Sequence, residues 1–377
     1  MNKAFFINGG AGRVLCSMPA LEKYAETHDD FIIVSESWSE LFLNNTKLRD
    51  HVYPMGHKDL FEEKLKDKEI VSPEPYRVNA YFNQKCNLIQ AFDIIINELD
   101  APRETGKINL DLNKEDQING HNLVAEVKQT LGKDKVIVFQ PFGQSTKVEG
   151  NFIFDSTGRS FEVSNVISII EELNKDFGVI LMSEIEIPGW SSLGVAKPNG
   201  MGLNGWAGVI NAADHFLGCD SVGQHLSYAV GKPTTVVIGS TYPENISYPK
   251  SDKFNVIDNG SGRRRYSPIR ITFDMNVDRN NEDLMVLDDK QISNIIKTIK
   301  GPEIKKVSKL KPGIAPTAPE KTKTLTPGVM PKKDIDISAP VKKFAEPFLT
   351  PRAKKKKKPI DELLEIEAVK PAKTIKS

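Results

Sequence analysis

The sequence lacks long hydrophobic runs and is poor in cysteine, and each absence excludes a class of protein. No stretch approaches the ~18 apolar residues that a membrane-spanning helix needs. The opening segment is too short for the hydrophobic core of a secretion signal, so we expect a cytoplasmic protein. Cys16, Cys86 and Cys219 are far apart, with no CxxC pair and no histidine at ligand spacing. This spacing argues against a disulfide framework and against a zinc site.

The formal net charge of +1 conceals an asymmetry along the chain. Residues 301–377 hold 19 Lys and Arg against 9 Asp and Glu, whereas the preceding residues hold 32 against 41. The same segment has 11 of the 23 prolines and few large apolar residues, so it cannot bury enough surface to offset the entropy of ordering. We predict a disordered Lys/Pro-rich tail behind an acidic body, which by itself is a poor binder of nucleic acid.

Two parts of this tail are candidates for contacts with partners. The run Lys354 to Lys358 suits a polyanion such as nucleic acid, an anionic membrane surface or an acidic protein. Residues 360–366 could fold into a helix on a partner, although a solvated tail is the simpler interpretation.

Short apolar strands alternate with helix patterns from the first residues onward, which is typical of a parallel sheet covered by helices. We expect Ser17 to cap the first helix and Pro19 to lie in its first turn. A polar passage at 106–120 predicts a domain junction, after which the alternation restarts. The expected strands are 3–8, 31–34, 51–54, 136–139, 179–182, 215–219 and 234–239, and the expected helices are 19–24, 38–42, 80–99, 161–177, 203–213, 222–230 and 289–300.

We therefore predict an α/β protein with two Rossmann-like doubly wound domains that face each other across a cleft. The N-terminal domain is expected to span residues 1–115 and the C-terminal domain residues 116–300, followed by the tail at 301–377. Ligands of such sheets bind at the carboxyl ends of the strands, so the loops that follow strands are the candidate sites.

The first candidate loop follows the opening strand and contains Gly10, Gly12 and Arg13. Glycines let backbone amides approach a ligand closely, and the next helix offers its positive end to a phosphate or carboxylate. The loop is neither a complete G-x-G-x-x-G nor a P-loop, and an ordinary tight turn fits these residues equally well.

The second candidate loop follows the strand at 215–219 and contains Asp220, Ser221 and His225. Ser221 is a plausible helix cap, and the helix end is expected to lower the pKa of His225, which could then donate to a phosphate or a sugar hydroxyl. A capped helix with a packed histidine is the structural alternative, but the position after a strand favours function.

The third candidate region is the pair of loops at 140–145 and 156–159. Arg159 has the donor fork that suits a diphosphate, although from this residue alone a surface arginine is the better interpretation. Glu184 and Glu186 could accept hydrogen bonds from sugar or ribose hydroxyls, or they could be solvated loop carboxylates.

Three segments in this order resemble glycosyltransferase family 9, the heptosyltransferase-like enzymes with the two-Rossmann-domain architecture called GT-B. The resemblance covers about the first 250 residues, and its specificity comes from the three segments together. They are residues 12–21 (GRVLCSMPAL), residues 140–143 (QPFG) with 158–161 (GRSF), and residues 217–226 (LGCDSVGQHL) with 231–234 (GKPT) and 239–243 (GSTYP).

The resemblance implies a nucleotide-diphosphate-sugar donor, commonly ADP-heptose, and a glycan or lipopolysaccharide-type acceptor. It implies no metal and no other cofactor, because basic side chains and helix ends stabilise the leaving diphosphate. It also implies an acceptor-side cleft loop of Gly10, Gly12 and Arg13. The donor-binding residues that it implies are Arg159, Asp220, Ser221, Gly223 and His225, with a weaker case for Glu184 and Glu186.

Two positions depart from the family's pattern. Arg13 occupies the position of the family's proposed catalytic Asp, and an arginine stays protonated and cannot accept the proton of an acceptor hydroxyl. Val222 stands where the family places a glycine. The catalytic base therefore stays unassigned.

The leading hypothesis is a glycosyltransferase. A catalytically inactive GT-B binding or structural module with a basic interaction tail is the alternative, which Arg13 and the tail favour. A nucleotide-sugar epimerase shares the architecture but ranks last, because its signature carboxylates are not apparent.

Overall fold

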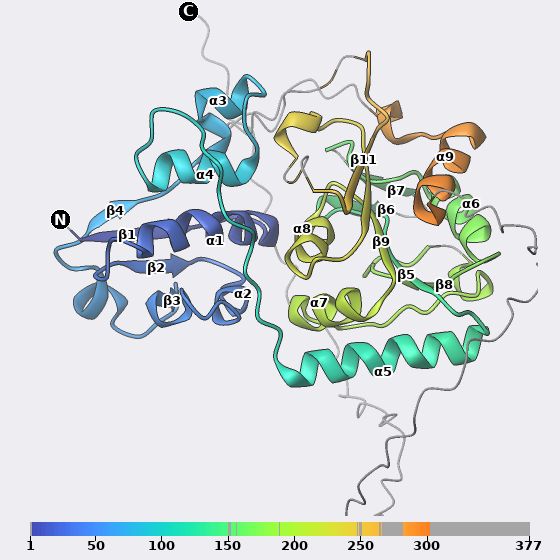
Figure 1. Ribbon diagram of the computed structural model, residues 1–377, viewed down its shortest axis with the longest axis horizontal. Helices are drawn as coiled ribbons and strands as arrows, with labels where there is room; N and C mark the ends of the chain where they lie inside the picture. Colours follow the sequence, from blue (N-terminus) through green and yellow to red (C-terminus); the bar gives the residue numbers. More distant parts are fainter. Residues whose placement is uncertain are drawn as a thin grey trace, which may run out of the picture. The chain divides into compact units, whose positions relative to one another are not determined.

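The structure is a computed structural model that describes residues 2–149, 152–155, 157–187, 189–246, 248, 251–263, 265 and 282–301. The predicted tail after Gly301, including the run Lys354 to Lys358 and the segment 360–366, lies outside the described residues. The described residues belong to one compact unit, Met1–Lys306. This unit contains two separate parallel sheets and a two-stranded hairpin, so the predicted α/β class is confirmed (Figure 1).

The N-terminal sheet has four parallel strands in the order β3-β2-β1-β4. The side chains of β1 alternate between its faces, as the pleat of a strand requires. Phe5 and Ile7 belong to the cluster that packs on helix α1, whereas Ala4 packs with Leu60 on the other face. The strands are β1 (Lys3–Ile7), β2 (Ile32–Ser35), β3 (Val52–Pro54) and β4 (Glu69–Val71).

The C-terminal sheet has five parallel strands in the order β11-β10-β9-β5-β8. Its interior strand β5, between β9 and β8, is buried on both faces, because Val136 and Val138 pack toward one helical layer and Ile137 and Phe139 toward the other. The strands are β5 (Val136–Gln140), β8 (Gly178–Leu181), β9 (His215–Cys219), β10 (Thr234–Ile238) and β11 (Phe254–Asp258), and the separate hairpin is β6 (Thr146–Glu149) with β7 (Phe152–Asp155).

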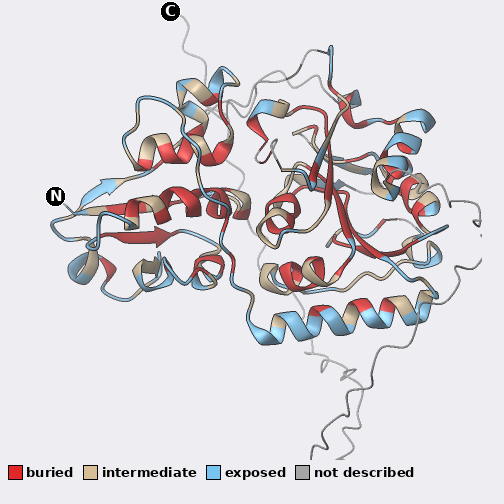
Figure 2. Ribbon diagram, viewed as in Figure 1, coloured by how far each residue is buried: buried red, intermediate tan, exposed pale blue. Residues whose placement is uncertain are grey.

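Helices cover both sheets, and Figure 2 shows the buried residues on the strands and on the helix faces that turn toward them. The outer side of the long helix α5 is exposed in the same view. The helices are α1 (Ala11–Ala25), α2 (Ser39–Leu43), α3 (Asn79–Phe82), α4 (Leu88–Ile96), α5 (Lys114–Leu131), α6 (Val163–Leu173), α7 (Leu203–Ala212), α8 (Val222–Ala229) and α9 (Asp289–Lys300).

The prediction for the first helix was wrong at its start. Helix α1 begins at Ala11, directly after the glycine turn, and Pro19 lies inside it. Ser17 is therefore not a cap; its hydroxyl donates to the Val14 carbonyl at 2.8 Å. The helix begins early because Gly10 is extended (φ −75°, ψ 160°) and serves as its N-cap residue.

The predicted helix at 80–99 is two helices, α3 and α4. Gln84 adopts a left-handed backbone (φ 54°) between them, which interrupts the helical path. Asn87 then begins α4 with a capping box, because its side chain accepts from the Gln90 amide while the Gln90 side chain accepts from the Asn87 amide.

The polar passage predicted as a junction at 106–120 is only partly a connection, because α5 begins at Lys114. Helix α5 packs closely on α7 through two glycines. A Cβ at Gly208 would lie 2.2 Å from the Asp116 carbonyl oxygen, and one at Gly120 would lie 2.3 Å from the Gly208 carbonyl oxygen. Only glycine permits this backbone approach.

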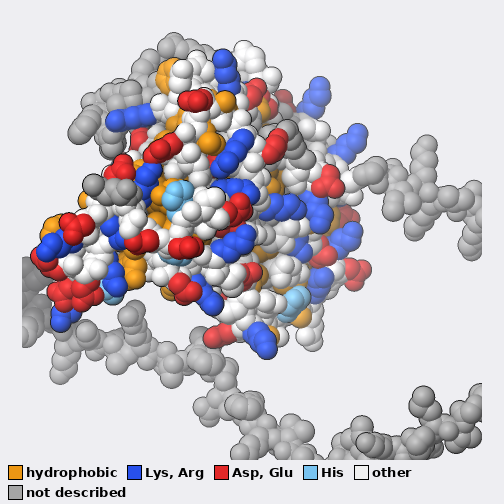
Figure 3. All heavy atoms as spheres, turned by 60° about the vertical axis from the view of Figure 1, so that its left-hand side comes forward, with side chains coloured by type: hydrophobic (Ala, Val, Ile, Leu, Met, Phe, Trp, Pro, Cys, Tyr) orange, Lys and Arg blue, Asp and Glu red, His pale blue; other side chains and the backbone are white. Residues whose placement is uncertain are grey.

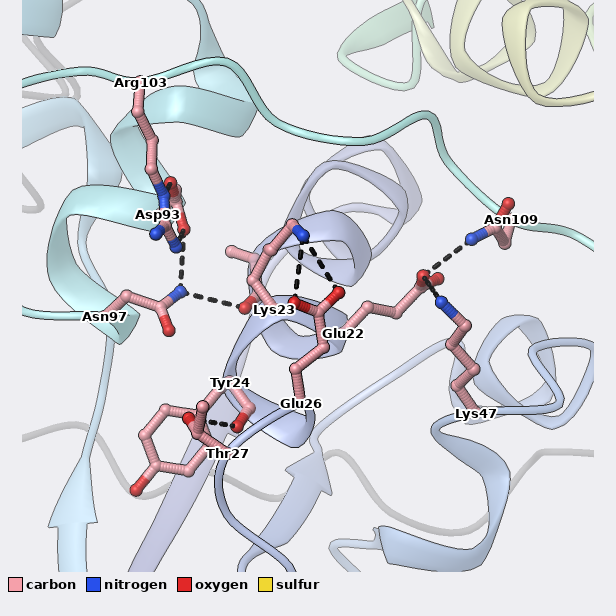
Figure 4. Close-up of polar contacts among 11 residues, drawn as sticks. Glu22, Lys23, Tyr24, Glu26, Thr27, Lys47, Asp93, Asn97, Arg103 and Asn109 are labelled. Atoms are coloured by element: carbon pink, nitrogen blue, oxygen red, sulfur yellow. Dashed lines mark hydrogen bonds and ion pairs between the residues drawn. The ribbon is translucent and has the colours of Figure 1, made fainter.

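The connection from α4 to α5 runs along α1 and is held there by buried carboxylates (Figures 1 and 4). Arg103 donates to both oxygens of the fully buried Asp93, at 2.7 and 3.0 Å. Further along, Asn109 donates to the buried Glu22 at 2.6 Å. The connection is thus fixed to the N-terminal sheet and its helices before α5 begins.

Candidate functional site

Each sheet has a topological switch point, where the chain changes the direction in which it adds strands. In the N-terminal sheet this point lies between β1 and β4, and in the C-terminal sheet between β5 and β9. Ligands of open parallel sheets bind in the crevice beyond the carboxyl ends of the strands at such points. The loops that follow β1, β4, β5 and β9 all contribute residues to one cavity.

This cavity has a volume of about 640 Å³, which falls in the usual range for small-molecule sites. The N-terminal sheet and its helices supply residues from the glycine turn and several aromatic side chains, and the C-terminal sheet supplies most of the polar side chains. The lining includes Gly10, Gly12, Arg13, Trp38, Tyr76, Tyr81, Gln140, Arg159, Met182, Glu184, Trp206, Asp220, Ser221, Gln224, His225, Thr241 and Asn245.

The start of helix α8 is organised by Gln140, the last residue of β5. Its side-chain oxygen accepts from the Gly223 amide at 2.9 Å, and its side-chain nitrogen donates to Ser221 Oγ at 3.4 Å. Ser221 is the N-cap residue but makes no side-chain capping bond, so the predicted capping by Ser221 was wrong. The Gln140 side chain, on the neighbouring strand β5, accepts from the first turn of the helix instead.

Gly223 permits this arrangement but does not line the cavity. A Cβ at Gly223 would lie 2.4 Å from both the Gln140 side-chain oxygen and the Phe216 ring. The glycine therefore lets α8 pack closely on the sheet, and its predicted role in donor binding stays a prediction.

Asp220 lies at the carboxyl end of β9 and is fixed by two neighbours. Thr241 Oγ1 donates to its Oδ2 at 2.6 Å, and the Gln224 side chain donates to its Oδ1. Since both donors come from residues that also line the cavity, Asp220 presents an oriented acceptor to a ligand there.

His225 reaches across to the glycine turn. A Cβ at Gly12 would lie 2.8 Å from the His225 ring, and Cys16 Sγ lies 3.5 Å from His225 Nδ1. The Tyr248 hydroxyl lies 3.1 Å from the same nitrogen. The structure therefore brings the second candidate loop into contact with the first.

The pKa of His225 is lowered to about 4, so the ring is neutral near pH 7. The predicted direction holds, but the main cause differs from the helix end that we expected. Burial disfavours the imidazolium most, and the charge of Arg159 lowers the pKa further against the opposing effect of Asp220.

Arg159 lines the cavity and is oriented by hydroxyl groups. Its Nε donates to Thr157 Oγ1 at 3.0 Å and its Nη2 to Ser145 Oγ at 3.4 Å. Nearby Asp155 accepts from Thr157 and Ser160. Burial alone would raise the pKa of Asp155, but these hydrogen bonds and the Arg159 charge hold it below its ordinary value. The hydrogen-bond partners of the Arg159 guanidinium among the described residues are hydroxyl groups, and its charge acts on Asp155 from a distance.

Arg13 is bound into the N-terminal sheet and its loops. Its guanidinium donates to Glu74 at 3.1 Å, to Asn8 at 2.9 Å and to the Pro73 carbonyl at 3.1 Å, and it lies 5.2 Å from the centre of the Tyr76 ring. Only 9% of Arg13 is exposed. These contacts satisfy the two terminal nitrogens of the buried cation and largely compensate its charge, whereas its buried Nε has no hydrogen-bond partner among the described residues.

The other predicted residues divide between the cavity and the surface. Glu184 is exposed and lines the cavity, whereas Glu186 is exposed and is not part of the lining. Within the described residues no cluster of three or more His, Cys, Asp or Glu side chains has metal-binding geometry. In the part of the chain that the structure describes, no helix is long and apolar enough to span a membrane.

Several lining residues were missed by sequence reasoning. The aromatic side chains Trp38, Tyr76 and Tyr81 follow strands β2 and β4, and Trp206 lies in α7. Trp38 carried a usable signal, because it follows a predicted strand just as Gly10 and Asp220 do. The tyrosines follow β4, a three-residue strand within a polar stretch, and so gave no such signal.

The fold is similar to the folds of several solved glycosyltransferase structures. The structure of Escherichia coli ADP-heptose LPS heptosyltransferase II aligns with a TM-score of 0.50 at 11% identity, covering 80% of this chain and 100% of that chain. A glycosyltransferase family 9 structure from Veillonella parvula aligns with a TM-score of 0.52 at 11% identity, covering 79% of this chain and 96% of that one.

The iron-containing dodecameric glycosyltransferase TibC from enterotoxigenic E. coli aligns with a TM-score of 0.52 at 13% identity, covering 79% of this chain and 76% of that chain. No protein-family model and no curated protein sequence matches the chain. At these identities the likeness establishes the fold, and the chemistry has to be argued from the residues.

Proposed function

Since the chain has the heptosyltransferase-like GT-B fold of glycosyltransferase family 9, we propose that it binds a nucleotide-diphosphate sugar in the cavity between its sheets and transfers the sugar to a glycan. The observation that carries this proposal is the contact between the two candidate loops. His225 packs against Gly12, and Asp220 and Arg159 line the same cavity. Donor-side polar groups and the acceptor-side turn are thus close enough to serve one reaction.

The donor diphosphate would lie against Arg159 and the start of α8. Arg159 supplies a cation that hydroxyl groups orient in the described structure, and helix α8 points its positive end at the same cavity. Asp220 would accept from hydroxyls of the transferred sugar, and Glu184 from hydroxyls of the ribose. Met182 and Trp206 provide apolar surface for the nucleobase.

In the transfer step, an acceptor hydroxyl oxygen attacks the anomeric carbon while the bond from that carbon to the diphosphate oxygen breaks. The diphosphate leaves with the electron pair, and Arg159 stabilises its developing charge, so the step needs no metal. The hydroxyl proton goes to a base. Among the lining residues that the structure describes, Asp220 and Glu184 are the carboxylates, and Arg13 is excluded by its charge.

A catalytically inactive binding module is the second candidate, and one observation favours it. Arg13 makes hydrogen bonds to Glu74, Asn8 and Pro73, so the position where the family has its proposed base is built into the protein framework. Such a module would bind the nucleotide sugar in the same cavity without turning it over.

Calorimetric titration with ADP-glucose, UDP-glucose, GDP-mannose and ADP tests the donor site. Arg159→Ala should weaken binding of the preferred nucleotide sugar about tenfold to a hundredfold, as expected for a lost charge-assisted hydrogen bond. Arg49→Ala removes a cation from the three-residue helix η1 (Arg49–His51) outside the cavity lining and serves as the control. Equal affinities for both variants and the parent would reject the site.

Product formation then separates the two candidates. Incubation of the parent with the bound nucleotide sugar and a glycan mixture should give a glycosylated product by mass spectrometry, and Asp220→Asn should reduce it. Tight donor binding with neither transfer nor slow hydrolysis of the donor would favour the inactive module.

A further inference from the structure

The acceptor side of the cavity is lined by aromatic rings. Trp38 follows β2, whereas Tyr76 and Tyr81 follow β4. Because β2 and β4 are the two neighbours of β1 in the sheet, these side chains lie on either side of the glycine turn that follows β1. The rings of Tyr76 and Tyr81 pack edge to face with centroids 5.6 Å apart. We call Trp38, Tyr76 and Tyr81 the aromatic subsite.

The backbone at Trp38 is in the left-handed region, with φ 64° and ψ 28°. This conformation is disfavoured for a large side chain and persists only where the surrounding structure holds it, often at a functional site. The turn before it is fixed by Ser35, whose hydroxyl donates to the Ser37 carbonyl at 2.7 Å. The chain thus keeps a strained, half-buried tryptophan at the wall of the cavity.

The aromatic subsite offers no uncompensated positive charge. Among the described lining residues, the one lysine or arginine from the N-terminal sheet and its loops is Arg13, and its guanidinium is paired with Glu74. His225, on the opposite wall, is neutral near pH 7 because it is buried. Arg159 comes from the C-terminal sheet, on the donor side.

The face of the molecule that Figure 3 shows carries charges of both signs. On the face that Figure 3 shows, acidic and basic side chains are interspersed with patches of hydrophobic ones. A phosphorylated glycan would need an exposed Arg or Lys to bind its phosphate, and this face presents no continuous basic field to attract one.

We propose that the aromatic subsite binds an uncharged sugar ring and discriminates against phosphorylated or carboxylated sugars. The apolar C–H face of a pyranose packs well on an aromatic ring, while its hydroxyls remain free to reach water and polar groups of the cavity. Its role as the acceptor subsite rests on the proposed function, but the binding of a neutral sugar does not.

Ligand-detected NMR titration of the full-length Arg159→Ala protein tests the preference, because Arg159 on the donor side of the cavity would itself bind a phosphate. The probes are the methyl glycosides of glucose, galactose, mannose and N-acetylglucosamine, each compared with the 6-phosphate of the same sugar. At least one neutral glycoside should bind about tenfold more tightly than its phosphate. A phosphate that binds as tightly or more tightly than every neutral probe would overturn the proposal, as would the absence of saturable binding by all neutral probes.

Two variants locate the binding. Trp38→Ala should lower the affinity for the neutral glycoside about tenfold. The control Trp190→Ala changes the three-residue helix η4 (Trp190–Ser192) outside the cavity lining and should leave that affinity unchanged. Glu74→Gln should release the charge of Arg13 while its bonds to Asn8 and Pro73 remain, and so raise the affinity for the sugar phosphate about tenfold. Unchanged phosphate affinity in Glu74→Gln would contradict the charge argument even if Trp38→Ala failed to fold.

The outcome is separable from that of the proposed function. Nucleotide-sugar binding that is intact in Trp38→Ala while neutral sugars fail to bind the parent would reject the aromatic subsite and leave the donor site standing. If neutral sugars bind at Trp38 but the protein binds no nucleotide sugar, the donor site is rejected and the aromatic subsite stands.

Discussion

Replacement of His215 by Gln should flatten the loss of stability that the protein suffers in mild acid. His215 begins β9, is 9% exposed, and its Nε2 lies 2.9 Å from Thr235 Oγ1. Burial lowers its pKa from 6.5 to about 4. Above pH 6.5 the imidazole is neutral in both the folded and the unfolded chain, and its titration costs no stability.

Between pH 6.5 and 4 the unfolded chain binds a proton at His215 that the folded chain does not bind. The free energy of unfolding therefore decreases as the pH is lowered through this range. The difference of the two pKa values corresponds to roughly 3 kcal/mol once the pH is below 4. At pH 5 the loss amounts to about 2 kcal/mol. His225, which has a pKa of about 4 for the same main reason, adds a similar loss, so His215→Gln should remove about half of the total.

Urea unfolding at pH 7 and pH 5, followed by circular dichroism, measures this difference. The quantity compared is the drop in the free energy of unfolding between the two pH values, which cancels any cost of the substitution itself. His121→Gln, on the exposed side of α5, is the matched control and should behave as the parent. A drop in His215→Gln as large as in the parent would refute the assignment of a buried neutral His215.

Two further predictions concern the framework around the cavity. Gly208→Ala should lower the free energy of unfolding by about 2 kcal/mol or more, because its Cβ would overlap the Asp116 carbonyl. Gly106→Ala, which meets no atom within 4 Å, should change the denaturation midpoint little, and equal effects of the two would contradict the close helix contact. Arg103→Ala should lower the free energy of unfolding in urea by about 3 kcal/mol, since it leaves the buried Asp93 without its cation. A decrease below about 0.5 kcal/mol would show that the ion pair does not hold the connection between α4 and α5.

Much of the fold was predictable because the signals are local. The strands around Phe5, Phe139 and Val236 are continuous apolar runs that end in turns, and such runs predict buried parallel strands. Strands β4 and β11 escaped prediction: β4 is three residues long, and both are recognisable mainly by the strands they pair with.

The site was predictable only in part, because its decisive contacts join residues far apart in the sequence. Gly12 and His225 could each be proposed from a position after a strand, but their contact depends on how the two sheets meet. No sequence signal indicated that Arg13 pairs with Glu74, 61 positions away. Nor did any indicate that the Gln140 side chain accepts the hydrogen bond that a helix cap would accept.

A structure of the protein bound to ADP or to its preferred nucleotide sugar tests the central claim most directly. The account predicts that the diphosphate lies between the Arg159 guanidinium and the first turn of α8, with the sugar within hydrogen-bonding distance of Asp220. A nucleotide bound outside the cavity between the two sheets, or inside it with the diphosphate away from both Arg159 and α8, would contradict the account.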